Sequence, residues 1–138
     1  MKNYCLLVIC GLMVGSVLAR IESAHAVAPF KKEFEEKYVK KDPTTPEEKA
    51  LAAAEMQAEC NVCHVGTKKK DHNAYGTALA ALLDKKTDTK DTAKIQAALD
   101  KVAEMKSNPN DANSPTFGEL IKQGKLPGGA EVAQAAAN

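Results

Sequence analysis

The chain is poor in aromatic residues and lacks tryptophan. Its 138 residues include only 3 Phe and 3 Tyr, and one of these, Tyr4, lies in an apolar N-terminal stretch. Aromatic side chains supply much of the apolar surface that a small domain buries. A small domain with so few of them is expected to depend on disulfides, a metal or a large cofactor for its stability.

An excess of charge of one sign is also absent. The chain has 19 basic and 18 acidic residues, and removing residues 1–26 would take away Lys2, Arg20 and Glu22 and leave 17 of each. Proteins that neutralise nucleic-acid phosphates need a basic excess or a basic stripe. We therefore expect no nucleic-acid partner, and we interpret the run Lys68-Lys69-Lys70 as a solvated loop rather than a docking site.

Signatures of catalysis are missing as well. The sequence contains neither a P-loop nor a GxGxxG fingerprint. No residues suggest a nucleophile with an adjacent base or a pair of carboxylates in a cleft. We therefore do not expect an enzyme.

The longest apolar stretch lies at the N-terminus. Lys2 precedes a segment that is too short to span a bilayer comfortably, and a small-x-small site follows at residues 24–26. These are the parts of a secretory signal peptide. We predict that residues 1–26 are a signal peptide cleaved after Ala26, with an uncleaved anchor or cleavage after Ala19 as alternatives. The mature chain is expected to have no membrane span and to be exported, to the bacterial periplasm or an intracytoplasmic lumen.

Disulfides are an unpromising source of stability here. Of the 4 cysteines, Cys5 and Cys10 belong to the predicted signal peptide, which leaves Cys60 and Cys63 in the mature chain. A single pair separated by two residues offers little disulfide framework.

The hydrophobic pattern of the mature chain predicts an all-α domain. No stretch alternates with period two over more than a few residues. Thr45 and Asp91 are expected N-caps, and Gly124 is expected to stop the last helix. The predicted helices cover residues 28–41, 45–60, 73–86, 91–107 and 116–123, with a loop at 108–115 between the last two.

Apolar residues at helical spacing mark the expected core. Three stripes are evident, and we expect each to face the interior of the domain. They are Phe30, Phe34 and Tyr38; Tyr75, Leu79, Leu82 and Leu83; and Ile95, Leu99, Val102 and Met105.

The most specific motif is AECNVCHVG at residues 58–66. C-x-x-C-H is the attachment signature for c-type haem. Two thiols at this spacing reach the two vinyl groups of one porphyrin, and the following imidazole binds the iron. Cys60 and Cys63 are thus the candidate anchors and His64 the candidate iron ligand. The alternatives are a thioredoxin-like pair, which lacks its βαβ context here, and a zinc site that adds His72, for which the ligand spacing is unusually tight.

The surrounding sequence resembles a known family. The run CNVCHVGTKKKDHNAYGTALAALL, preceded by FKKEFEEKYVK and followed by TFGELIKQGKLPGG, resembles small monohaem cytochromes c of planctomycete and anammox bacteria. The resemblance implies a class I-like cytochrome c fold, with helices wrapped around one covalently attached haem c (heme c). The apolar spacing, the attachment motif and the composition of the C-terminus further predict an N-terminal amphipathic helix at 27–44, a haem-binding domain at 45–128 and a flexible tail at 129–138.

The second axial ligand is less clear from the sequence. Class I relatives usually supply a methionine downstream of the motif, and Met105 is the only one after His64. Met105 also continues an apolar stripe and would equally serve as core. His72 is the rival ligand, Met56 is expected to pack near the haem edge, and Tyr75 is a candidate hydrogen-bond donor to a haem propionate or a packing residue.

These features together predict an exported one-electron carrier. A single haem with two protein ligands exchanges one electron through its exposed edge and docks redox partner proteins. If Met105 is only core, the iron is open and a gas-binding protein for NO or CO becomes the alternative. A haem subunit of a larger complex, or a homodimer, would use the Phe30, Phe34 and Tyr38 stripe as its interface.

Overall fold

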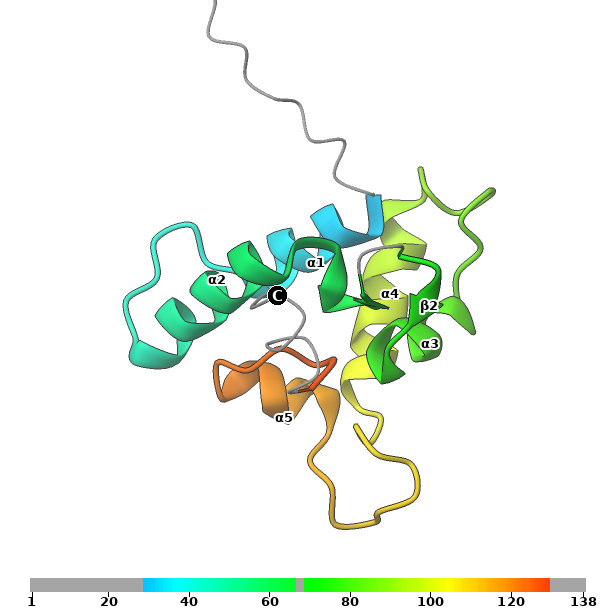
Figure 1. Ribbon diagram of the computed structural model, residues 1–138. Coiled ribbons are helices and arrows are strands. Elements are labelled where there is room, and N and C mark those ends of the chain that lie inside the picture. The colour runs from blue at the N-terminus through cyan, green and yellow to red at the C-terminus, as the bar shows by residue number, and fades with distance from the viewer. Residues whose placement is uncertain (1–28, 67–68, 130–138) are drawn as a thin grey trace, which may run out of the picture.

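The computed structural model of the chain describes residues 29–66 and 69–129 and is mostly helical (Figure 1). This confirms the all-α prediction at the level of fold class. The predicted signal peptide and most of the predicted tail lie outside the described residues. The helices are α1 (Pro29–Tyr38), α2 (Pro46–Ala58), α3 (Ala74–Ala80), α4 (Thr92–Ala103) and α5 (Phe117–Lys122), with a short 3₁₀ helix η1 (Glu59–Val62) after α2.

Helices α2, α3, α4 and α5 begin where the sequence predicts, because each of these starts carries a side-chain cap. The Thr45 hydroxyl accepts a hydrogen bond from the Glu48 backbone N–H, and the Glu48 carboxylate accepts one from the Thr45 N–H. This reciprocal capping box satisfies backbone donors that the first turn leaves free. Asp91 caps α4 through the Lys94 N–H, and Thr116 caps α5 with a second capping box.

All five helices end earlier than predicted, and α3 and α4 do so by the most residues. α3 ends at Ala80 rather than near residue 86, and α4 ends at Ala103 rather than at 107. After α4 the backbone is engaged elsewhere, since the Phe117 N–H donates to the Met105 carbonyl at 3.0 Å. Met105 therefore lies in the turn that leads out of α4 and not inside the helix.

A single apolar cluster forms the core, and Tyr75 lies within it. The Tyr75 ring is packed edge-on between Phe34 and Phe117, with ring centroids 5.8 Å and 5.2 Å away. Offset and edge-on aromatic pairs of this kind add stability beyond the area that they bury. Thirteen residues make up the cluster: Phe34, Leu51, Ala58, Val62, Tyr75, Leu79, Leu83, Ile95, Ala98, Leu99, Val102, Phe117 and Ile121.

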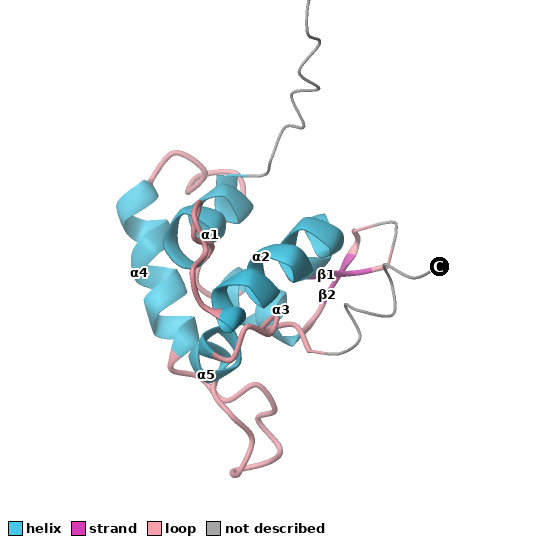
Figure 2. Cartoon of the chain, turned by 90° about the vertical axis from the view of Figure 1, so that its left-hand side faces the viewer, coloured by secondary structure: helices cyan, strands magenta, loops and turns pink. Residues whose placement is uncertain are grey.

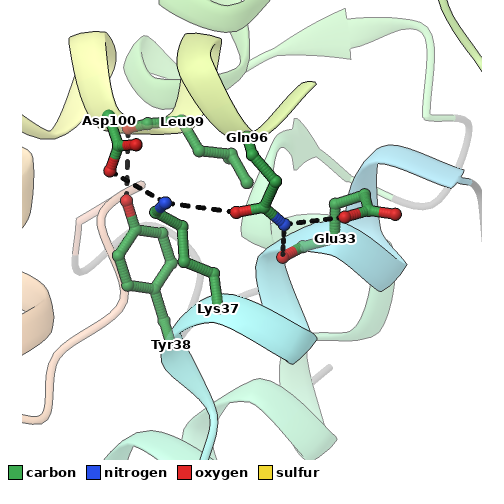
Figure 3. Close-up of polar contacts among 6 residues, drawn as sticks. All are labelled: Glu33, Lys37, Tyr38, Gln96, Leu99 and Asp100. Carbon is green, nitrogen blue, oxygen red and sulfur yellow. Dashed lines mark hydrogen bonds and ion pairs between the residues drawn. The ribbon is translucent and has the colours of Figure 1, made fainter. Parts of the chain in front are cut away.

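Polar contacts fix α1 against α4 (Figure 3). The Lys37 ammonium lies 3.1 Å from the Gln96 side-chain oxygen and 2.8 Å from the Asp100 carboxylate, and the Tyr38 hydroxyl donates to the Leu99 carbonyl at 3.2 Å. The Gln96 amide in turn donates to Glu33 at 2.7 Å. The apolar stripe of α1 packs against the core of the same domain, with Phe34 in the apolar cluster and Phe30 and Tyr38 against it.

A short antiparallel ribbon lies on either side of the lysine run that the sequence analysis interprets as a solvated loop. β1 (His64–Val65) pairs with β2 (Asp71–His72), and His64 lies directly opposite His72. Figure 2 shows this ribbon on the right and α4 on the left, with the long α4–α5 loop extending below the helices. None of the helices within the described ranges is both long and apolar enough to cross a membrane.

Candidate functional site

A pocket of about 720 Å³ lies beside η1 and the β1–β2 ribbon. Its lining includes all three residues of the predicted attachment site, Cys60, Cys63 and His64, together with His72. This volume is within the ~300–1,000 Å³ typical of sites for small molecules and cofactors. The apolar part of the wall comes from α1, η1, α3 and the turn after α3. It consists of Phe30, Val62, Leu79, Ala80 and Leu83.

The two cysteines are placed by the transition from α2 to η1. Cys60 lies in η1, and Cys63 follows it with its N–H donating to the Cys60 carbonyl at 3.3 Å. Both thiols are free and both residues are half-buried. Burial, with Cys60 nearby, raises the pKa of the Cys63 thiol to about 12. The Cys63 thiol is therefore held protonated on an apolar wall.

His64 forms the first residue of β1, and its ring stacks on that of His72. The ring centroids are 4.6 Å apart and the planes are inclined by 31°. Burial, helped by the neighbouring His72, lowers the pKa of His64 and favours the neutral imidazole. Neutral imidazole is the form that binds iron and other metals. The Nδ1 atom of His64 is buried and has no hydrogen-bond partner in the described structure.

The two histidines occupy the same wall of the pocket. Because His72 is the cross-strand neighbour of His64 and stacks on its ring, the two imidazoles do not face each other across the cavity. His72 therefore lies beside the candidate iron ligand His64, and not on the far side of the pocket, where a second axial ligand would be needed.

The two methionines within the described ranges, Met56 and Met105, lie outside this pocket. Met105 does not line the pocket and is 45% exposed, so it belongs neither to the pocket wall nor to the core that the sequence offered as its alternative position. Met56, expected to pack near the haem edge, is 76% exposed and is also absent from the wall.

Tyr75 is the centre of the core rather than a pocket residue. Its side chain is fully buried, and its hydroxyl has no hydrogen-bond partner among the residues that the structure describes. Burial strongly raises the pKa of this hydroxyl, so it is a neutral donor. Its packing against Phe34 and Phe117 matches the alternative role that the sequence analysis gave it.

A set of lysines at the pocket is a feature that the sequence analysis did not identify. Lys69 and Lys70 come from the β1–β2 turn, while Lys85 and Lys86 come from the segment after α3. These four residues are exposed. Lys31 of α1 completes the basic set, and Glu59 and Asp84 are the acidic residues of the same lining. We call these seven residues the charged rim. The sequence signal was present only as two separate lysine runs, which the fold brings to one opening.

The chemistry of the lining fits a c-type haem. Two free thiols, a neutral imidazole and an apolar wall are the groups that covalent attachment and axial ligation require. The buried Nδ1 of His64 has no hydrogen-bond partner among the described residues, and a buried polar atom of this kind is costly unless a bound group satisfies it. Within residues 29–66 and 69–129, no three His, Cys, Asp or Glu side chains are grouped in a way that could hold a metal ion by themselves.

The site is interpreted from its own geometry. No protein-family model, curated protein or solved structure matches this chain.

Proposed function

We propose that the protein is an exported monohaem cytochrome c that carries single electrons between redox partners. The observation that carries the proposal is the arrangement of Cys60, Cys63 and His64 along one wall of a pocket whose other walls are largely apolar. A wall of this kind excludes water from the iron, and burial together with axial ligation sets the reduction potential.

Each residue of the motif has a defined task in this proposal. Cys60 and Cys63 would hold one porphyrin through thioethers and fix its orientation, while His64 would supply the imidazole that binds the iron. The haem supplies the one-electron chemistry when bound. Leu79 of α3 and Leu83 of the turn after it line the pocket, and they would shield a bound haem from solvent. This role needs no catalytic residue, and we propose that the protein is not an enzyme.

The charged rim indicates the kind of redox partner. Lys31 is paired with Glu35 and Glu55. The other four lysines and the two acidic residues leave the rim with a net excess of two positive charges, although the mature chain is predicted to be neutral. Oppositely charged surfaces steer association and orient the two proteins. We therefore propose that the electron partner presents an acidic surface to this opening.

A gas-binding haem protein is the second candidate, and a specific observation favours it. Neither methionine of the described residues lines the pocket, and His72 is stacked against His64 instead of facing it. An iron bound by His64 alone would be open to CO or NO. By contrast, the stripe of α1 that a partner subunit would need contacts α4 and the core of the same chain, so a haem subunit of a larger complex is less well supported.

Intact mass and spectra of the exported protein test the proposal. The chain, produced with a haem-attachment system, should carry one haem that survives denaturation. Cys60→Ala with Cys63→Ala should abolish the covalent haem, whereas His64→Ala should keep some covalent haem and lose the low-spin spectrum. A native mass without haem contradicts the proposal. With haem present, a low-spin ferrous spectrum unaffected by CO supports the carrier, and a high-spin spectrum that shifts with CO supports the gas binder.

A further inference from the structure

Asn73 binds the backbone of the attachment motif at three consecutive residues. Its side-chain Nδ2 donates to the Asn61 carbonyl and to the Val62 carbonyl, each at 3.0 Å. Its backbone N–H donates to the Cys63 carbonyl at 3.1 Å. All three carbonyls of the segment between Cys60 and His64 are therefore satisfied by one residue.

The other end of the same side chain fixes the start of α3. The Asn73 Oδ1 accepts a hydrogen bond from the Gly76 N–H at 2.9 Å, as an N-cap does. Asn73 is only 5% exposed. Buried amides are costly unless their donors and acceptors are used, and here both ends of the amide are engaged with different elements.

These contacts exceed what capping requires. A helix N-cap needs only a side-chain oxygen that accepts from the first turn, and Asp or Ser provides it as well as Asn does. The two Nδ2 hydrogen bonds to residues 61 and 62 contribute nothing to the cap. They connect α3, which carries the apolar wall of the pocket, to the segment that carries the thiols.

We propose that Asn73 is a positioning residue for haem attachment. It holds the backbone of residues 61–63 so that the Cys60 and Cys63 thiols and the His64 imidazole are presented to the pocket together. The inference rests on the proposed function. Its physical basis is that η1 is a four-residue 3₁₀ helix, and short 3₁₀ helices have poor hydrogen-bond geometry of their own. Without the amide, the carbonyls of Asn61 and Val62 lose their donor and the segment is free to rotate.

Asn73→Asp separates this role from capping. Aspartate keeps the oxygen that accepts from Gly76 but has no N–H, and it places a carboxylate against two carbonyl oxygens. Asn73→Ser is a milder variant that also retains a capping oxygen. Thr116→Ala, which removes the cap of the distant helix α5, is the matched control for a general loss of helix stability.

The measurement is made on the full chain produced with a haem-attachment system. Pyridine haemochrome spectra give the ratio of haem held by one thioether to haem held by two, and thermal unfolding gives stability. Because this ratio is counted per haem, it can be measured even if little protein accumulates. We expect Asn73→Asp to raise the single-thioether fraction at least ~fivefold, the factor that corresponds to one ordinary hydrogen bond. Asn73→Ser should also raise the single-thioether fraction. Thr116→Ala should lower the stability and leave the single-thioether fraction unchanged.

Three outcomes are distinguishable. If the wild-type chain carries no covalent haem, the proposed function itself fails. If the wild type carries haem and the ratio is the same in Asn73→Asp, Asn73→Ser and Thr116→Ala, Asn73 is only a cap and the inference is overturned. If the ratio changes in both Asn73 variants but not in the control, the positioning role is established.

Discussion

Gly76 lies so close to Cys63 that no side chain fits between them. A Cβ atom built at Gly76 would be 1.9 Å from the Cys63 carbonyl oxygen and 3.1 Å from the His72 ring. The close approach is possible because Asn73 ends the β1–β2 ribbon and begins α3 immediately afterwards. The absence of a side chain at one position therefore lets α3 pack directly on the attachment motif.

Replacing Gly76 with alanine should separate these two elements. The backbone carbonyl cannot move away like a flexible side chain, so α3 must shift, at a cost of about 1–3 kcal/mol in the free energy of unfolding. Chemical denaturation checks the value, and the yield of covalent haem should fall with it. Thr77→Ala changes the next position of α3, which is exposed. It should alter the free energy of unfolding and the yield of covalent haem much less than Gly76→Ala does. Equal effects of the two variants would show that the contact is unimportant.

Met105→Ala tests whether this residue reaches the iron. Because its side chain is exposed and outside the pocket, we expect a change of at most ~0.5 kcal/mol in the free energy of unfolding, as for other surface positions. The Soret band and the near-infrared region should also stay as they are. A new CO-binding spectrum in this variant would instead identify Met105 as the distal ligand.

His72→Ala is the companion variant for the distal side. The stacked ring of His72 helps to lower the pKa of His64. Replacing His72 with alanine removes this neighbouring ring, but it does not remove a second ligand of the iron. We expect the haem to stay attached and the iron to keep its spin state. If His72→Ala alone opens the iron to CO, the protein is a bis-histidine carrier and the ribbon rearranges when haem binds.

The charged rim should govern electron exchange with anionic reagents. Reversing the charge of both Lys69 and Lys70 to Glu should slow reduction of ferricyanide by the ferrous protein about 10-fold at low salt, since electrostatic steering of this size is common. The difference should shrink as added salt shortens the Debye length. Stopped-flow absorbance measures the rates. Lys101→Glu with Lys125→Glu changes the net charge equally away from the pocket, and an equal slowing by this pair would show that only net charge matters.

A half-buried ion pair between α1 and α2 gives the stability a defined pH dependence. The Lys31 ammonium pairs with Glu55 of α2 and with Glu35 of its own helix. Burial raises the pKa of Glu55 above the ordinary value of 4.5, although Lys31 opposes this. The folded state therefore holds the Glu55 proton more tightly than the unfolded state does, and ionising Glu55 costs stability as pH rises past 4.5.

Lys31→Met should strengthen this dependence. Without the ammonium, the ionised Glu55 is left unpaired, and we expect a loss of about 1–3 kcal/mol at neutral pH, between the values for exposed and for buried pairs. The loss should be small below pH 4.5, where Glu55 becomes protonated. Melting temperatures of Lys31→Met and of the wild type, taken above and below pH 4.5, measure this loss of stability. Lys32→Met removes an exposed partner of Glu36, so a deficit of the same size and pH dependence in that variant would refute the explanation.

Much of the secondary structure could be predicted from local chemistry. Thr45, Asp91 and Thr116 cap helices in the structure because each hydroxyl or carboxylate lies within reach of a backbone N–H a few residues later. The stripe Ile95, Leu99 and Val102 is buried because its spacing places it on one face of α4. Met105 fits the same spacing but leaves the stripe, because long-range backbone bonds to the α5 segment end the helix first.

The sequence by itself determined the chemistry of this protein: two thiols and an imidazole at fixed spacing, an all-helical pattern and too few aromatics for a large core. These depend on residue identity and on separations of a few residues. Only the tertiary structure decided what surrounds the motif. The stacking of His72 on His64, the contact of Gly76 with Cys63 and the meeting of two lysine runs at one opening arise from how the chain packs. Such contacts join distant segments, and their energies are set by packing and burial rather than by local propensity.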